Sequence, residues 1–468
     1  MTAASTIRPR ASAEILVSAI ADLKATFGTR LSTAVAVREH HGRDVTSHEG
    51  LPDAVVFAQS TEEVSRAVTI CAAHGVPMVA FGTGTSLEGH IAALHGGISI
   101  DVSQMNAVLE VNAEDLDCLV QAGVTRKQLN EYVRHDGLMF PIDPGADASL
   151  GGMIATGASG TNAVRYGTMR ENVLGLTVVL ADGRVVRTGG RARKSSAGYD
   201  LTRLMVGSEG TLGIVTEARL RLRGIPESIA AAVCSFESLE GAVMTVIQTI
   251  QMGIPIARIE LLDEVQIDAV NRYSKLDYPV LPTLFLEFHG TANWTEEQAA
   301  IVGELAGDNG GHGFQWTMQA EERARLWQAR HDAFYAAKSL RVGSMAWVTD
   351  VCVPISRLAE CILETKREIL ERGILAPIVG HVGDGNFHLT CLLDPDSEEE
   401  WAAVRALNDS MVSRALAMGG TCTGEHGIGY GKIDLLAKEH GDALATMRAI
   451  KQALDPQGLM NPGKIIRL

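Results

Sequence analysis

The sequence predicts an α+β protein with two or three domains, and three observations support that prediction. The chain has 468 residues, of which 46% are apolar and 21% charged, so it has enough apolar residues for a packed core and too few charges for a disordered chain. Short strands alternate with helices before Pro226, and longer helices alternate with strands after it. Glycine supplies 48 residues, many of them gathered in three loops of the first half.

The elements before Pro226 follow from apolar spacing and from turn residues. Residues 13–27 have the spacing of an amphipathic helix. A second helix over 61–75 is expected to be capped by Thr61 and to end at Gly75. A third helix is expected over about 125–136, and Asp182-Gly183 predicts a hairpin turn. Strands are expected over 53–58, 76–82, 98–102, 118–124 and, around the hairpin, 175–189.

The elements after Pro226 repeat one pattern twice. Strands over 232–236, 257–263 and 283–290 accompany a helix over 238–253. A strand over 347–354, a helix over 355–373 and a strand pair within 376–394 follow. Such β-α-β units are typical of a separate α+β domain. The last stretch, 433–468, predicts two helices before the tail.

Charge and cysteine content exclude several classes of protein. The formal net charge of -15 argues against a nucleic-acid-binding protein, because no basic stripe is available for phosphates. The seven cysteines include no C-x-x-C pair, which favours buried thiols in a reducing compartment. No apolar run reaches the ~18 residues of a membrane span. Arg8 and Arg10 precede the first acid, Glu14, as in a weak transit peptide, but a plain helix is favoured and a secretory signal is not.

The three glycine-rich loops predict a site for an extended ligand that carries a diphosphate. FGTGTSLEG (81–89) follows a strand, but it lacks the Lys of a phosphate-binding P-loop and the spacing of a dinucleotide fingerprint. Alone it is compatible with a plain turn. The loops over 144–167 and 207–217 are also rich in small residues, which allow close approach of backbone N–H groups to an anion. Long loops of this kind in a compact domain are usually functional.

Two histidines and an acid–histidine pair predict a divalent-metal site. His381 and His388 are separated by a Gly-Asp-Gly-Asn turn, with strands on either side. Glu425 and His426 lie in a second glycine-flanked loop. Neighbouring residues of an extended loop point in opposite directions, so one of this pair is expected to bind metal and the other to face the substrate. Two histidines and a carboxylate suit Zn²⁺, without excluding Mn²⁺ or Fe²⁺; four polar loop residues with no shared site are the alternative.

Seven long strings of the sequence carry a resemblance to a known family. They are FGTGTSLEGH (81–90), 143–175, GSEGTLGIVTE (207–217), TDVCVPISRL (349–358), GHVGDGNFH (380–388), GTCTGEHGIG (420–429) and DPQGLMNPGK (455–464). Over nearly its whole length the chain resembles the FAD-linked D-lactate dehydrogenases of the cytochrome type. These belong to the vanillyl-alcohol oxidase flavoprotein group, together with the flavoprotein component of glycolate oxidase and D-2-hydroxyglutarate dehydrogenase.

The resemblance implies a fold and a domain organisation. The fold is α+β, with a two-part FAD-binding domain of the vanillyl-alcohol oxidase (PCMH) type and a cap domain whose antiparallel sheet is covered by helices. The expected parts are an N-terminal helical segment (1–46), the FAD-binding domain (47–226), the cap with metal ligands (227–424) and a C-terminal segment that returns to the FAD domain (425–468).

The same resemblance implies a non-covalent FAD site, because the first loop has no histidine between its glycines, although His90 lies just beyond it. The first loop would bind the diphosphate, the second would lie along the flavin, the third would contact the adenosine half, and the tail would return near the isoalloxazine. In that order the expected residues are Gly82, Thr83, Gly84, Thr85 and Ser86; Pro144, Gly145, Ser149, Gly152, Gly157 and Asn162; Glu209, Gly213, Ile214 and Val215; and Asn461.

Catalytic and metal-binding roles also follow from the resemblance. His381, His388 and Glu425 would bind one divalent metal, Zn or Mn, and His426 would be the general base. Arg330 would hold the substrate carboxylate. The implied reaction oxidises D-lactate, or a similar small D-2-hydroxy acid, to the 2-oxo acid, with hydride transfer to flavin N5. Val348 stands where the 2-hydroxyglutarate branch has a lysine, which disfavours a dicarboxylate substrate.

Rival interpretations and partners stay open at this point. Glycolate or D-2-hydroxyglutarate is the alternative substrate of the same fold. A metallohydrolase without flavin and a non-catalytic component of a larger flavin complex are the alternatives of other classes. Cytochrome c or a quinone-linked carrier is the expected electron acceptor. A homodimer is the oligomeric state considered for this protein. A cytoplasmic location is expected, with contact to the membrane surface left open and the mitochondrion as the alternative.

Overall fold

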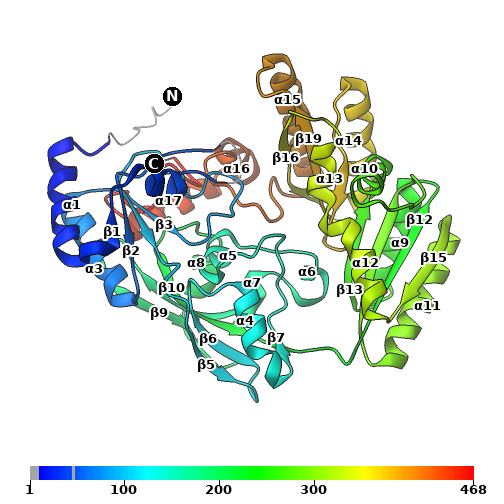
Figure 1. Cartoon of the computed structure of the whole chain (residues 1–468), viewed down its shortest axis with the longest axis horizontal. Helices are drawn as coiled ribbons and strands as arrows, with labels where there is room; N and C mark the ends of the chain where they lie inside the picture. Colours follow the sequence, from blue (N-terminus) through cyan, green and yellow to red (C-terminus); the bar gives the residue numbers. More distant parts are fainter. Residues whose placement is uncertain (1–9, 45–47, 468) are drawn as a thin grey trace. The chain divides into compact units, whose positions relative to one another are not determined.

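The computed structural model describes residues 10–44 and 48–467, which form two compact units (Figure 1). The first unit comprises Met1–Ser159, Gly167–Ile225 and Glu425–Leu468. The second comprises Gly160–Tyr166 and Pro226–Gly424. The segments 1–46, 47–226 and 425–468 therefore belong to one unit, apart from Gly160–Tyr166 and Pro226. Their limits as separate domains stay predictions.

Two main sheets and one small strand pair build the first unit. One sheet has the order β1-β2-β4-β3 and the other β5-β6-β10-β8-β9, while β11 pairs with β7. The strands of the first sheet are β1 (Leu31–Ser32), β2 (Ala54–Phe57), β3 (Met78–Phe81) and β4 (Ile98–Asp101). The others are β5 (Val108–Asn112), β6 (Asp117–Gln121), β7 (Leu138–Met139), β8 (Val173–Val179), β9 (Val185–Gly189), β10 (Ile214–Arg221) and β11 (Arg223–Gly224).

The parallel core of the first sheet positions the first glycine loop. β2 and β3 both pair with β4 in parallel. Every residue of β4 is buried, as expected for a parallel strand covered on both faces. The loop from Gly82 begins where β3 ends, at the carboxyl edge of these strands. Ligands of open parallel sheets bind outside this edge, so the fold puts the loop where a ligand is expected.

In its described residues the first unit contains the five helices that the sequence patterns predict, with small differences at their ends, and four short helices that were not predicted. They are α1 (Ala13–Phe27), α2 (Val35–Gly42), α3 (Thr61–His74), α4 (Arg126–Val133), α5 (Leu150–Thr156), α7 (Met169–Asn172), α8 (Leu201–Met205), α16 (Ile433–His440) and α17 (Ala443–Leu454). The prediction that Thr61 caps α3 is wrong: the Ser60 side chain accepts from the N–H of Glu63, while the Thr61 hydroxyl donates to Thr216. Gly75 ends α3 in the left-handed conformation, as predicted.

One antiparallel sheet is the framework of the second unit. Its order is β15-β12-β14-β13-β18-β19-β16, and β17 also pairs with β19. All of these pairs are antiparallel, which confirms the predicted architecture. The strands are β12 (Ser228–Phe236), β13 (Ile256–Leu262), β14 (Thr283–Gly290), β15 (Gly311–Thr317), β16 (Met345–Val348), β17 (Val351–Cys352), β18 (Ile378–Gly380) and β19 (Asn386–Leu393).

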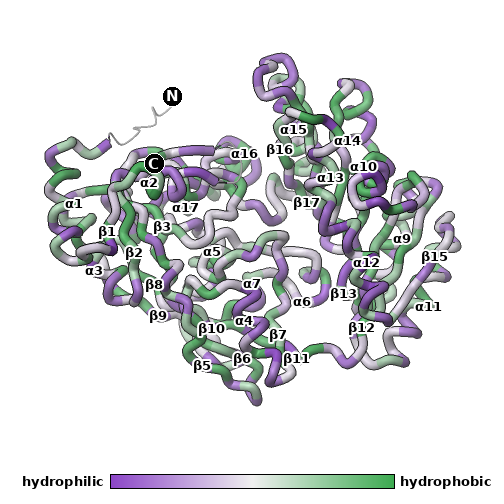
Figure 2. Tube along the Cα trace, viewed as in Figure 1, coloured by the Kyte–Doolittle hydropathy of each residue, from purple (hydrophilic) through white to green (hydrophobic). Residues whose placement is uncertain are grey.

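Helices cover both faces of that sheet. They are α6 (Ala163–Tyr166), α9 (Leu239–Gln251), α10 (Glu264–Ser274), α11 (Ala292–Asp308), α12 (Ala320–His331), α13 (Ala333–Ser339), α14 (Leu358–Arg372) and α15 (Glu398–Ala417). Ala231 and Val233 of β12 share a core with Trp327 of α12. The alternate residues Ala232 and Cys234 are buried on the other face, where α9 and α11 pack against β12. In Figure 2 the tube through these helices carries both hydrophilic and hydrophobic residues.

The state of the cysteines and the lengths of the apolar helices agree with what the sequence predicts. All seven cysteines are free thiols, and six of them are buried. Burial raises the pKa of the Cys71 thiol to about 12, so it stays protonated. Among residues 10–44 and 48–467, no helix has both the length and the apolar character of a bilayer span.

Asp263 predicts a measurable pH dependence of stability. It caps α10, where its Oδ1 accepts from the N–H groups of Gln266 and Ile378 at 2.9 and 3.2 Å, and it is 1% exposed. Burial raises the pKa of this carboxyl to about 6, although Lys366 opposes the shift. Because the folded pKa exceeds the unfolded one, the stabilising contribution is complete at low pH and is lost as the pH rises through about 6.

The test is the substitution Asp263→Asn, which keeps the capping oxygen and removes the ionisation. The free energy of unfolding of the wild type, relative to the variant, is expected to fall by about 2 kcal/mol between about pH 4.5 and about pH 7. Urea titrations of both proteins across this range measure it. A difference between the two proteins that does not change with pH contradicts the account.

Candidate active site

The first glycine loop is packed against the start of the second one. Gly84 has φ +69° and Gly89 has φ +75°, conformations that favour glycine. The N–H of Ser149 donates to Thr83 Oγ1 at 3.3 Å. The first and second loops therefore form one surface within the first unit.

Two buried hydroxyls on this surface suit an anionic ligand. Ser86 Oγ and Ser149 Oγ are buried and have no hydrogen-bond partner among the described residues. An unsatisfied buried hydroxyl costs about 1–3 kcal/mol. Phosphate oxygens accept hydrogen bonds from hydroxyl groups, and loops rich in glycine leave room for such an anion. The residues of the first two loops therefore fit the diphosphate of a dinucleotide cofactor such as FAD.

The second and third loops are also joined. Gly157, with φ +67°, ends α5 in the left-handed conformation. The N–H of Gly207 donates to Ile154 O at 2.9 Å, and the N–H of Glu209 donates to Ala155 O at 2.8 Å. The region 144–167, expected as a long loop, thus contains the short helices α5 and α6. Of the other residues predicted there, Pro144 is half-buried, Gly145 is exposed, and the Cβ of a residue in place of Gly152 would lie 3.0 Å from Ser149 Oγ.

Glu209 ties the third loop to the C-terminal segment. It adopts φ +51° and is 5% exposed. Its carboxylate accepts from the N–H groups of Ile428 and Gly429 at 2.7 and 2.8 Å. Gly213, Ile214 and Val215 follow at the start of β10, where they are buried. In the described structure the Glu209 carboxylate thus has a structural partner, while the contacts of these four residues with the adenosine half stay predictions.

Asn461 fixes the tail beside β3. Its N–H donates to Met78 O at 2.7 Å, and its Nδ2 donates to His90 O and Glu209 O at 3.0 and 2.7 Å. Lys464 is 2% exposed and donates to Asn461 Oδ1 at 3.2 Å. Burial lowers the pKa of Lys464 to about 7, although Glu209 opposes the shift. The C-terminal segment therefore returns to the first unit, and its contact with the isoalloxazine stays a prediction.

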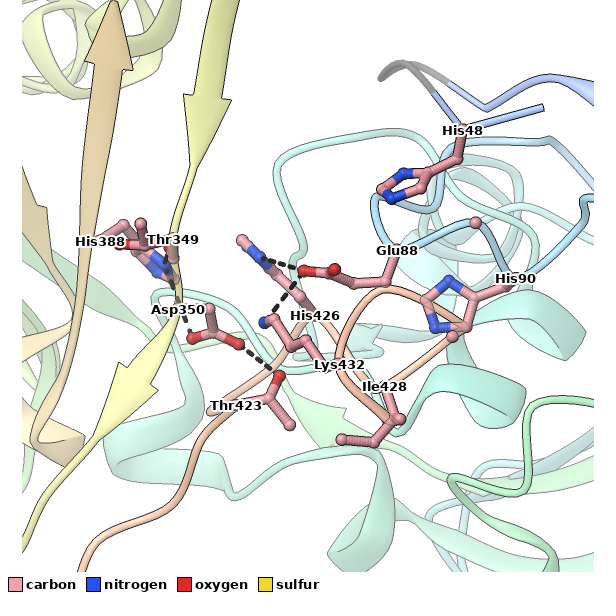
Figure 3. A network of polar contacts seen from close by, with 12 residues as sticks. His48, Glu88, His90, Thr349, Asp350, His388, Thr423, His426, Ile428 and Lys432 are labelled. Atoms are coloured by element: carbon pink, nitrogen blue, oxygen red, sulfur yellow. Dashed lines mark hydrogen bonds and ion pairs between the residues drawn. The ribbon is translucent and has the colours of Figure 1, made fainter. Parts of the chain in front are cut away.

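His426 lies in a buried polar cluster of the first unit (Figure 3). Its Nδ1 is 3.7 Å from Glu88 Oε1, and Lys432 Nζ is 2.9 Å from the same oxygen. Burial alone would raise the pKa of Glu88, but Lys432 and His426 hold it below its ordinary value. An anionic Glu88 beside Nδ1 would stabilise a protonated imidazole, which is what a general base becomes after it accepts a proton.

The histidine pair of the second unit lies where a reversal of the chain joins β18 to β19. Gly385, with φ +79°, closes the turn. The imidazole centroids of His381 and His388 are 5.4 Å apart, and one ring nitrogen from each lies within 4.8 Å of the other. This spacing lets both rings bind one metal ion.

Each of these imidazoles is oriented through Nδ1. His388 Nδ1 donates to the carbonyl oxygen of Thr349 at 3.0 Å. His381 Nδ1 donates to Glu260 Oε1 at 2.7 Å. A carbonyl or carboxylate oxygen accepts only, so in the neutral form of each imidazole the proton lies on Nδ1 and Nε2 carries the lone pair that a metal requires. The pair therefore fits a divalent metal ion. Glu425, the third predicted ligand, is half-buried and directly follows Gly424, the last residue of the second unit.

Arg330 lies on α12 of the second unit, near its end. Its Nε donates to Glu260 Oε2 at 2.7 Å, and its side chain is 18% exposed. Glu260 thus contacts both Arg330 and His381. Burial alone would raise the pKa of Glu260, but His381 and Arg330 hold it below its ordinary value. Asn162 also belongs to the second unit, where its Oδ1 accepts from Arg258 Nε at 2.8 Å.

Sequence reasoning missed several buried charged residues. Glu88 and Lys432 stand in or beside the glycine-rich strings, and a charged residue inside a loop of small residues is a signal that could have found them. Glu260 stands in the ordinary strand string ARIELLD, which gives no such signal. Asp350 accepts from Asn386 Nδ2 and from Thr423 Oγ1, each at 2.7 Å, and so links β19 to the segment before Glu425.

Comparison with known proteins matches two segments of the chain to protein families. Residues 52–189 match the FAD binding domain family, and residues 225–465 match the C-terminal domain of FAD linked oxidases. The zebrafish (Danio rerio) probable mitochondrial D-lactate dehydrogenase is 56% identical over 94% of this chain and 89% of its own length. The mitochondrial D-lactate dehydrogenase (cytochrome) of Arabidopsis thaliana is 47% identical over 96% of this chain and 80% of its own.

The chain belongs to the family of FAD-linked D-lactate dehydrogenases. The predicted resemblance is therefore confirmed, and the protein is an oxidoreductase of this type. Among solved structures, 4-ethylphenol oxidase from Gulosibacter chungangensis is similar with a TM-score of 0.78, over 97% of this chain and 98% of that one, at 21% identity. That likeness supports the predicted fold of the vanillyl-alcohol oxidase type.

The contact between the first two loops predicts that FAD loading of this dehydrogenase depends on Gly82. In Gly82→Ala the new methyl group would displace Ser149 Oγ, because the two would lie 2.3 Å apart. The affinity for FAD is expected to fall by roughly tenfold or more, equivalent to about 1.4 kcal/mol. Equilibrium dialysis and the flavin absorbance per chain measure it.

Gly190→Ala is the matched control, since a Cβ at Gly190 meets nothing within 4 Å. It should keep the FAD content of the wild type. Equal FAD affinity in Gly82→Ala and Gly190→Ala would contradict the role of this contact.

Proposed function

We propose that this protein oxidises D-lactate, or a similarly small D-2-hydroxy acid, to the corresponding 2-oxo acid. The observation that carries the proposal is the pair of imidazoles, His381 and His388, oriented through Nδ1 in a chain that is 56% identical to a D-lactate dehydrogenase. FAD, when bound, supplies the acceptor for the hydride from C2. Val348, in place of a lysine, supports a substrate with one carboxylate.

Each proposed catalytic group has a definite task. Arg330 binds the substrate carboxylate through its Nη atoms, because its Nε is used by Glu260. His426 takes the proton of the 2-hydroxyl on Nε2, because its Nδ1 faces Glu88. The anionic Glu88 then stabilises the imidazolium. Before the proton moves, the positive charge of Lys432, whose Nζ is 2.9 Å from Glu88 Oε1, balances the negative charge of Glu88.

We further propose that His381, His388 and Glu425 hold one divalent metal ion, zinc or manganese. A divalent ion, when bound, lowers the pKa of a coordinated hydroxyl and so supplies Lewis-acid assistance. Two neutral imidazoles and one carboxylate suit such an ion and leave coordination positions open for substrate. Electrons would pass from the flavin to cytochrome c or to a quinone-linked carrier. The names of both relatives include a mitochondrial location, which supports the mitochondrial alternative.

Substrate range is the first test. With an artificial electron acceptor, D-lactate is expected to give a kcat/KM at least tenfold above that of L-lactate, glycolate and D-2-hydroxyglutarate, since an unpaired carboxylate or a lost side-chain contact costs about 1–3 kcal/mol. Preference for glycolate or D-2-hydroxyglutarate would reassign the substrate within the family. Poor turnover of every acid would favour a component of a larger flavin complex.

Substitution of His426 tests the proton transfer. His426→Gln is expected to lower the rate of flavin reduction by D-lactate about 10²–10⁴-fold, because the general base is lost while FAD stays bound. Stopped-flow absorbance measures this rate. His440→Gln, which alters an exposed histidine of the same C-terminal segment, should reduce flavin at the wild-type rate. Full activity of His426→Gln would refute the role of His426.

Removal of the metal ion tests the ligand set. Dialysis against a chelator is expected to lower turnover at least tenfold without loss of FAD, and Mn²⁺ or Zn²⁺ should restore it. His388→Ala should contain no stoichiometric metal by elemental analysis. His312→Ala, at an exposed position of the same unit, is the control and should keep one ion per chain. Undiminished turnover in a metal-free wild type would exclude metal assistance.

A further inference from the structure

Glu260 occupies an unusual position for a glutamate. It lies on β13, in the centre of the second unit's sheet, and is 1% exposed. Its two carboxylate oxygens have different partners: Oε1 accepts from His381 Nδ1 and Oε2 from Arg330 Nε, each at 2.7 Å. One buried carboxylate therefore bridges a residue proposed to bind metal and a residue proposed to bind the substrate.

The strand and the helix that carry this bridge are also joined at a second point. Arg258 lies two residues before Glu260, hence on the same face of β13. The Arg258 guanidinium is 5.1 Å from the centroid of the Trp327 ring. Trp327 and Arg330 are three residues apart on α12, hence on the same face of that helix. Two consecutive contacts therefore fix α12 against β13, and with it the place of Arg330.

The bridge also determines which atom of each partner is used in the contact with Glu260. The bond to Glu260 puts the proton of His381 on Nδ1 and leaves the lone pair on Nε2. The bond from Arg330 uses Nε and leaves the Nη edge of the guanidinium for a carboxylate. A carboxylate is suited to both tasks at once, because each oxygen accepts and neither donates.

We propose that Glu260 is a positioning residue shared by the two binding functions: it orients His381 for a divalent metal ion and Arg330 for the substrate carboxylate. The inference rests on the proposed function and adds a residue to which no role has been given. Glu260 touches neither ligand. It acts through the two side chains that do.

Glu260→Gln is the decisive variant. Glutamine has one accepting oxygen and one donating NH₂, so it can accept from only one of the two partners, and its NH₂ faces an N–H donor on the other. Loss of such an outer partner typically lowers metal affinity 10–100-fold. The expected result is a metal affinity reduced by about 10–100-fold, together with an increase of about tenfold or more in the KM for D-lactate. FAD content and kcat at saturating metal should change less than the metal affinity and the KM for D-lactate.

Glu260→Asp separates charge from reach. It keeps the negative charge and both accepting oxygens, but it is one methylene shorter and is expected to recover only part of either affinity. It also serves if Glu260→Gln does not fold. Glu264→Gln is the matched control, because Glu264 follows the same strand and pairs with Lys366 without contacting His381 or Arg330. This control should bind metal and D-lactate as the wild type does.

The experiment uses the full chain loaded with FAD and stripped of metal. Equilibrium dialysis with Mn²⁺ or Zn²⁺ alone, followed by elemental analysis, gives the metal affinity without any substrate. Steady-state kinetics at saturating metal give KM and kcat. Joint loss of metal affinity and of D-lactate affinity in Glu260→Gln, with partial recovery in Glu260→Asp, supports the shared role.

The remaining outcomes overturn the inference in distinguishable ways. Wild-type metal affinity and KM in both Glu260 variants would show that Glu260 is not a positioning residue, while the proposed function stands. A change in only one of the two affinities would refute the sharing. A wild type that binds no divalent metal would overturn both this inference and the metal part of the proposed function. Oxidation of D-lactate by that metal-free wild type would leave the proposed substrate in place.

Discussion

Each unit of this protein depends on one buried glutamate whose two carboxylate oxygens accept hydrogen bonds from segments distant in sequence. Glu209 accepts from the N–H groups of Ile428 and Gly429, more than two hundred residues away. Glu260 accepts from His381 and Arg330. A buried carboxylate is costly unless every oxygen is satisfied, so each glutamate constrains the segments that satisfy it. The segments so constrained are those that carry the proposed functional residues.

In the first unit this constraint explains why the chain returns to its first sheet after the second unit. Glu209, in the left-handed conformation, presents its carboxylate to the backbone just after His426. Asn461 and Lys464 then close the tail over the loop that follows β3. Ser86 on the first loop and Ser149 on the second have buried hydroxyls without a hydrogen-bond partner among the described residues. A dinucleotide cofactor would complete the polar contacts that the chain leaves open.

In the second unit the sheet brings together groups that an apolar core would otherwise exclude. Leu262 and Val379 face each other in register, and both belong to the core shared with Trp327. Glu260 and His388 lie on the same face, next to that core. The charged group is therefore surrounded by well-packed side chains, which fix rotamers as well as distances. Preorganisation of this kind keeps ligand-binding atoms in place before the ligand arrives.

Periodicity and turn residues predicted several helices and strands, while the two-part FAD-binding domain and the antiparallel sheet of the cap were implied by the family resemblance. The helix over 13–27, the hairpin at Asp182-Gly183 and the two C-terminal helices depend on local patterns, and the structure confirms them. The cap of α3 was misplaced by one residue because Ser60 and Thr61 both suit a cap, and only backbone geometry decides between them. The helix α5 escaped because small residues dominate its sequence. The helix α6 escaped because it has only four residues, and it belongs to the second unit through tertiary contacts.

The candidate site was predictable only where its residues stand in distinctive strings. His381, His388 and His426 lie in glycine-flanked motifs, which drew attention to them. Glu260 lies in ordinary strand sequence, and its partner His381 is 121 residues away. Nothing local marks a strand glutamate as buried. Such residues become visible only when the fold brings their partners together.

Anaerobic titration of the FAD-loaded protein with D-lactate, followed by its visible spectrum, tests the central claim most directly. The account predicts that D-lactate bleaches the flavin band near ~450 nm while L-lactate leaves it unchanged. The reason is that hydride transfer to the flavin requires one configuration at C2 of the substrate. A flavin band that D-lactate does not bleach, in a protein that is loaded with both FAD and metal, would contradict the assignment of D-lactate as the substrate.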